Sequence, residues 1–289
     1  MTSYISEHLF NSFTYVNEIY ISQPTSITKS EHLNLELLEW KTKLEERDNL
    51  MKDSTYVPKK IQRNISDIGN NFHYITFNVF SEMPFSYYIY TPTTSSISNT
   101  KMKYYSKLIS FLSHFIYDMM VRRNGECVNK IHFRSVHVHL YMTGHKKVLP
   151  AKKIKLNANY VNTGLTEAYS DTGNLIIFRK EEWYKTLIHE LLHLFGADQH
   201  TLLDKRNKST LLNMFNVQSH MRYGESYVEF WANVLQSAFL SYYQNMENYH
   251  AFQVQFETYL HLELQFSLYQ ANKILNYMGV SYEDLYKEV

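Results

Sequence analysis

The sequence predicts an α+β fold, and three patterns support this class. Short β-prone runs are concentrated between residues 72 and 178. One strong helical pattern interrupts them, and the chain after residue 196 shows mainly the helical period. We therefore expect a domain at 71–289, with a sheet-containing part (71–196) and a mainly helical part (197–289).

Residues 1–70 are expected to form a mostly helical N-terminal extension. The first 30 residues are polar and lack a clear period. Ser30 then precedes an amphipathic helix that is predicted to run to about Met51. Its apolar stripe consists of Leu33, Leu37, Trp40 and Leu44. Residues 53–69 contain Pro58 and several polar residues, and they read as a linker.

The sheet-containing part begins with predicted strands at 72–77 and 87–90, followed by a Ser/Thr-rich loop at 91–100. A helix comes next, with a stripe formed by Tyr104, Leu108, Phe111, Phe115 and Met119. Beyond it we expect a strand at 136–141, an extended segment at 159–165 and a strand at 174–178. His137 and His139 share one strand face, where they form either a polar sheet surface or a metal-binding pair.

The strongest chemical signal is HELLH at residues 189–193. It lies in a segment from Glu181 to Phe195 that is apolar on most sides, which predicts a largely buried helix capped by Gly196. Residues four apart share one helix face, so His189 and His193 can bind one zinc ion. The carboxylate of Glu190 can then take a proton from zinc-bound water.

Two histidines leave a tetrahedral zinc ion short of one protein ligand. A second helix is predicted after Gly224, and it carries Glu225 and Glu229 one turn apart. One carboxylate could bind the ion, while the other accepts the outward N–H of a ligating imidazole. The residues themselves leave open which glutamate has which role.

This arrangement resembles the gluzincin branch of the zincin metallopeptidases, in which a glutamate ligand follows HExxH on a later helix. The resemblance implies one Zn²⁺ ion held by His189, His193 and Glu225, with Glu229 orienting an imidazole. It also implies a zincin-like fold, with a mixed sheet over the HExxH helix. In that family an edge strand binds extended substrate, and residues 159–165 occupy the matching place in chain order, where they form either such a strand or an ordinary loop.

A competing ligand arrangement begins at the same motif. HExxHxxG also opens the metzincin signature, whose third ligand falls six residues after the second histidine. That position is Gln199 here, a poor zinc ligand, with Asp198 and His200 on either side as the alternative donors.

A further resemblance covers residues 160–240. The segments VNTGLT, RKEEWYKTLIHELLH and GESYVEFWA are similar to uncharacterised HExxH proteins of large DNA viruses. This similarity implies a viral protein that acts in the infected cell or is carried in the particle.

Composition excludes several other classes of function. The formal net charge is +1 and no long block of like charge occurs, so we expect no nucleic-acid partner. Cys127 is the only cysteine, which rules out an intrachain disulfide. The first 20 residues do not resemble a signal peptide, and no stretch is long and apolar enough for a membrane span. We expect an intracellular protein that is neither secreted nor membrane-bound.

The sequence therefore predicts a zinc peptidase that hydrolyses a peptide or protein substrate through metal-activated water, with Glu190 as general base. Candidate donors to the oxyanion of the transition state are Tyr223, His220, Arg222 and Tyr160. Two alternatives remain open. One is a catalytically inactive, zinc-containing structural or virion protein with the same fold. The other is a peptide-binding module in which HELLH is a coincidence.

Overall fold

A computed structural model describes residues 2–21, 26–52, 55–91, 97–123, 133–151, 154–167, 172–200, 205–215 and 223–286. Cys127, His220 and Arg222 lie outside these residues. The chain divides into two compact units. The sheet unit comprises residues 12–149 and 155–195, and the helical unit comprises residues 1–11, 150–154 and 196–289. The fold is α+β with a mixed six-stranded sheet.

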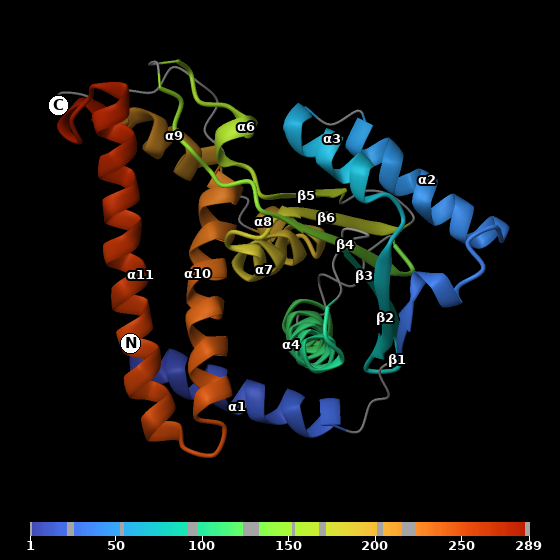
Figure 1. The fold of residues 1–289 in the computed structure, drawn as a ribbon. Coiled ribbons are helices and arrows are strands. Elements are labelled where there is room, and N and C mark those ends of the chain that lie inside the picture. Colours follow the sequence, from blue (N-terminus) through green and yellow to red (C-terminus); the bar gives the residue numbers. More distant parts are fainter. Residues whose placement is uncertain are drawn as a thin grey trace. The chain divides into compact units, whose positions relative to one another are not determined.

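The sheet unit is built on strands in the order β1-β2-β3-β4-β6-β5 (Figure 1). The strands are β1 (Ser26–Lys29), β2 (Phe72–Val79), β3 (Met83–Tyr90), β4 (Val136–Thr143), β5 (Gly164–Glu167) and β6 (Gly173–Arg179). Strands β3, β4 and β6 run parallel, whereas β1, β2 and β3 pair antiparallel. The edge strand β5 is antiparallel to β6, so the sheet is mixed.

One face of the sheet is covered by α2 (Leu38–Lys52) and α3 (Lys59–Ile68), as Figure 1 shows. The apolar cluster on this face joins Trp40 and Leu44 of α2 to Ile61, Ile65 and Ile68 of α3. Its sheet side consists of Phe72, Tyr88, Tyr90, Tyr141, Ile176 and Phe178. Side chains along a strand alternate between the two faces of the sheet. The residues next to these in each strand therefore point to the other face.

That other face packs against α4 (Asn99–Tyr117) and α7 (Trp183–Leu194). The Tyr87 hydroxyl of β3 lies 2.6 Å from Ser113 of α4, and Phe77 of β2 stacks on His114. Helix α4 continues into a π-helical turn, Asp118–Arg122. The predicted helix through Tyr104 and Met119 is therefore confirmed, and it begins five residues earlier, at Asn99 after the capping Ser98.

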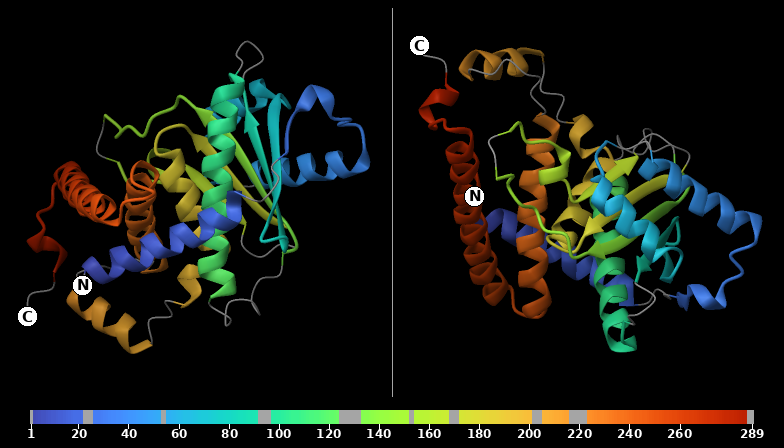
Figure 2. Two further views of the ribbon diagram at one scale, coloured as in Figure 1. Left: turned by 90° about the horizontal axis from the view of Figure 1, so that it is seen from below. Right: turned by 45° about the horizontal axis from the view of Figure 1, so that its top comes forward.

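The helical unit contains α8 (Ala197–His200), α9 (Lys205–Met214), α10 (Tyr223–Gln244) and α11 (Tyr249–Met278). Helices α10 and α11 lie side by side (Figure 2). Phe10, from the first part of α1 (Thr2–Ile21), contacts Tyr242, Tyr249 and Phe252. The final predicted segment is one continuous helix rather than a pair.

Residues 1–70 are mostly helical, as predicted, but two of their helices, α1 and α3, lie where the local pattern gave no helix. Residues 2–21 form helix α1, because Leu9, Phe13 and Val16 recur at helical spacing and are buried. Residues 59–68, expected as part of a linker, form α3 between Pro58 and Gly69. Pro58 stands just before the first helical residue, where its missing N–H costs nothing. Two 3₁₀ turns, η1 (Ser30–His32) and η3 (Glu283–Leu285), complete the described elements.

The structure also assigns parts of residues 1–70, predicted as an extension, to the sheet unit, because β1, α2 and α3 all belong to it. Among the described helices, none combines the length and the apolar character that crossing a bilayer requires.

Candidate metal centre

The HELLH motif lies in α7, whose ends are fixed by the local backbone. Glu182 adopts a left-handed conformation (φ 57°) immediately before the helix, and its carboxylate pairs with Lys147 at 2.6 Å. Gly196 (φ 74°) follows the helix in the left-handed region that favours glycine, as the sequence predicted. Leu187, Ile188, Leu191 and Leu192 are buried. The apolar residues thus anchor α7 in the sheet unit.

The two histidines of the motif bring their Nε2 atoms close together on one face of α7. The Nε2 atoms of His189 and His193 lie 3.1 Å apart, and both side chains are only partly buried. In a tetrahedral zinc site, two nitrogens at about 2.0–2.1 Å from the ion are separated by about 3.3 Å. The observed spacing therefore fits two ligands of one ion, which makes this pair the core of a candidate metal site.

Glu190 lies one position after His189 and is 8% exposed. Its carboxylate accepts a hydrogen bond from the hydroxyl of Thr166 in β5, with Oγ1 2.7 Å from Oε2. The same hydroxyl lies 3.2 Å from the carbonyl oxygen of Glu190. A charged hydrogen bond of this length compensates part of the cost of burying the carboxylate.

Strand β5 approaches α7 very closely at Gly164. A Cβ atom at this position would lie 2.9 Å from Thr186 Cγ2 and 3.1 Å from Glu190 Oε1. Any larger residue would therefore push the strand away from the helix or displace the carboxylate. Part of the predicted extended segment 159–165 is helical, since Ala158–Val161, which include Tyr160, form the short helix α6.

The remaining candidate ligands belong to the helical unit. Glu225 is exposed in the first turn of α10, and Glu229 follows one turn later and is partly buried. Asp198 of α8 lies against the start of α10, because a Cβ at Gly224 would be 2.9 Å from Asp198 Cβ. Tyr223 is the first residue of α10. His200 ends α8, and its side chain lies outside the described part of the chain.

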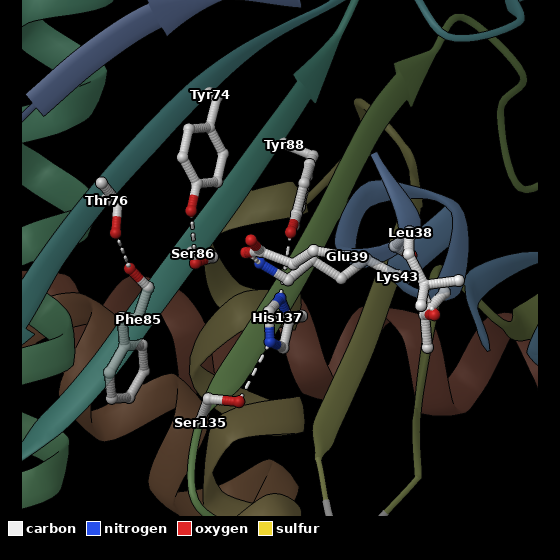
Figure 3. A network of polar contacts seen from close by, with 11 residues as sticks. Leu38, Glu39, Lys43, Tyr74, Thr76, Phe85, Ser86, Tyr88, Ser135 and His137 are labelled. Carbon is white, nitrogen blue, oxygen red and sulfur yellow. Dashed lines mark hydrogen bonds and ion pairs between the residues drawn. The ribbon is translucent and has the colours of Figure 1, made fainter. Parts of the chain in front are cut away.

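The second histidine pair has a different environment. His137 Nδ1 lies 3.0 Å from the Tyr88 hydroxyl and Nε2 lies 3.0 Å from Ser135 Oγ (Figure 3). His139 Nδ1 lies 2.9 Å from the Tyr90 hydroxyl. Burial lowers the pKa of His137 to about 4, and it also lowers the pKa of His139. Both rings are buried, so they form a hydrogen-bonded polar pair on a covered face of the sheet rather than an exposed polar surface.

Sequence reasoning assigned no role to Thr166 and Gly164. Both belong to the VNTGLT segment, which was noted for its resemblance to viral proteins and overlaps the candidate edge segment 159–165, but neither residue was singled out within it. A strand of four residues at a sheet edge has too short a pattern to show which helix it contacts.

The chain matches no protein-family model, no curated protein and no solved structure.

Proposed function

We propose that this chain is a zinc-dependent peptidase of the zincin type. The observation that carries the proposal is the 3.1 Å separation of His189 Nε2 and His193 Nε2, next to the buried carboxylate of Glu190. His189, His193 and Glu225 together have the donor types of a catalytic zinc site. We propose these three as the ligands.

The sheet supports the same proposal. Strand β5 is an edge strand that runs antiparallel to β6 and packs against α7, which carries the motif. An edge strand has backbone N–H and C=O groups that can pair with an extended peptide. A peptide added along β5 would pass close to Glu190, because Thr166 of that strand contacts it.

The chemistry follows from the residue types. Zinc, when bound, supplies a Lewis acid that lowers the pKa of a coordinated water towards about 7. Glu190 accepts the proton of the attacking water and delivers it to the leaving amine. We assign Glu229 to orienting an imidazole ring and Tyr223 to stabilising the oxyanion of the transition state. An exchange of roles between Glu225 and Glu229, or ligation by Asp198 or His200, is the alternative ligand set.

Glu190→Gln tests the general base. The amide has nearly the same shape but cannot accept the proton, so zinc content should stay at one ion per chain while hydrolysis of a peptide library falls by at least about 100-fold. Zinc is measured by mass spectrometry of the purified protein, and cleavage by product analysis. Full activity in this variant would exclude Glu190 as the base.

The experiment also separates the competing functions. Zinc without any peptide cleavage would indicate a structural or virion protein. The absence of stoichiometric zinc would favour a peptide-binding module. A hydroxamate, which chelates catalytic zinc, should inhibit the enzyme only if the peptidase proposal is correct. The similarity to HExxH proteins of large DNA viruses extends this proposal to a viral enzyme that acts in the infected cell or is carried in the particle.

A further inference from the structure

We infer that Thr166 is a positioning residue that fixes the carboxylate of Glu190 in the orientation needed for proton transfer. The inference rests on the proposed function, because it gives Thr166 its role through Glu190. Its structural basis lies entirely within the sheet unit.

The hydroxyl of Thr166 can donate only one hydrogen bond. Its shorter contact is the one to Glu190 Oε2, at 2.7 Å, compared with 3.2 Å to the Glu190 carbonyl oxygen. The carboxylate is thus the better placed acceptor. A hydrogen bond to an ionised acceptor is also stronger than one to a neutral acceptor.

Thr166 is itself held in a fixed position. Its backbone pairs with Leu175 of β6, which is fully buried in the sheet. A threonine side chain has few rotamers, so a paired strand also restricts the direction of its hydroxyl. The donor that contacts Glu190 is therefore part of a rigid element rather than of a loop.

Gly164 provides the close approach that this contact requires. The strand lies so near α7 that a Cβ at residue 164 would be 3.1 Å from Glu190 Oε1. The two residues of β5 thus limit the carboxylate in different ways: Thr166 binds Oε2, and the backbone at Gly164 restricts the space around Oε1.

Orientation matters for a glutamate because its long side chain has several rotatable bonds. A general base acts only when its oxygen is within hydrogen-bonding distance of the proton it accepts. A contact that holds the carboxylate should therefore affect the turnover number and leave substrate binding and zinc binding unchanged.

Thr166→Val tests this role, because it keeps the shape of the side chain and removes the donor. The expected result is a decrease in kcat of about 10-fold to 100-fold, as for other residues that orient a reacting group, with KM and zinc content unchanged. Thr166→Ser restores the hydroxyl and should recover most of kcat.

Thr76→Val is the matched control. Thr76 lies in β2, which β3, β4 and β6 separate from β5, and its Oγ1 donates a hydrogen bond to the carbonyl oxygen of Phe85 at 3.2 Å. The same chemical change in a strand away from Glu190 should leave kcat, KM and zinc content at the wild-type values.

A second measurement does not depend on activity. In crystal structures of the zinc-loaded variants, the Glu190 carboxylate should be displaced or disordered in Thr166→Val and restored in Thr166→Ser. An unchanged carboxylate, an unchanged kcat, or a loss of zinc in Thr166→Val would overturn the inference. If the wild-type protein cleaves nothing, the proposed function fails, and the carboxylate position still decides whether Thr166 holds Glu190.

Discussion

At the scale of single residues, two pairs of histidines in the sheet unit occupy different environments. His137 and His139 are buried in the sheet and bonded to tyrosine hydroxyls. His189 and His193 are partly exposed on one helix face. A neutral imidazole suits both environments, because it can form a hydrogen bond with a tyrosine hydroxyl or donate a lone pair to a metal ion. Only the second pair has both nitrogens directed to one point.

The buried histidine His137 should make the fold sensitive to acid. Its pKa is lowered to about 4 by burial and, to a smaller extent, by Lys43. Well above pH 6.5 the ring is neutral in both the folded and the unfolded state and has no effect on stability. As the pH falls from about 6.5 to about 4, the unfolded chain binds a proton that the folded chain does not. The free energy of unfolding should therefore decrease by about 3 kcal/mol over this range.

Urea unfolding at several pH values between 7 and 4 measures this loss. His137→Asn removes the titrating group while keeping a polar side chain near Tyr88, so its stability should fall less between pH 6.5 and 4 than that of the wild type. His32→Asn, at an exposed position of η1, is the control and should behave like the wild type. Equal acid losses in wild type and His137→Asn would contradict the prediction.

At the scale of elements, several long patterns could be predicted, whereas strands of four residues could not. The predicted strand at 136–141 and the HELLH helix correspond to β4 and α7, whose periods extend over 8 and 12 residues. Strands β1 and β5 have four residues each, and their partners are chosen by tertiary contacts. The contact between Thr166 and Glu190 joins residues 24 positions apart, so no local pattern could reveal it.

Helix α3 does have a helical pattern, yet it was predicted as part of a linker. Its three isoleucines have helical spacing, but Pro58 and the many polar residues around them favoured a linker. The proline does not interrupt the helix, because it stands at the N-cap position. Packing against the sheet then supplies the stability that a ten-residue helix lacks by itself.

This dependence on packing can be measured at Ile61, which is 2% exposed within the cluster of α2, α3 and the sheet. Ile61→Ala removes buried methyl groups and leaves a cavity, so the free energy of unfolding should decrease by about 2–5 kcal/mol in urea titrations. Lys60→Ala, on the exposed side of the same helix, should change it by less than about 0.5 kcal/mol. Similar effects of the two variants would show that α3 does not contribute to the core.

At the scale of the whole molecule, the net charge of the chain indicates little about its binding partners. The chain has 29 basic and 28 acidic residues, so its net charge by itself favours neither acidic nor basic partners. The proposed metal is the strongest concentrated charge that the candidate metal centre would contain, and its binding should be visible in the stability of the protein as well as in its activity.

A ligand that binds only the folded state stabilises it according to its concentration and dissociation constant. Zinc added to chelator-treated protein at about 1,000 times its Kd should therefore increase the free energy of unfolding by about 4 kcal/mol. Glu225→Ala should remove most of this increase, because the site would lose a ligand. Glu229→Ala should weaken zinc binding only by about 10-fold to 100-fold, as expected for a residue that orients an imidazole.

Glu247→Ala, at an exposed position beyond α10, is the control and should respond to zinc like the wild type. If Glu229→Ala loses more of the zinc-dependent stabilisation than Glu225→Ala, the two glutamates have the opposite roles. An unchanged melting temperature of the wild type on addition of zinc would exclude the zinc site.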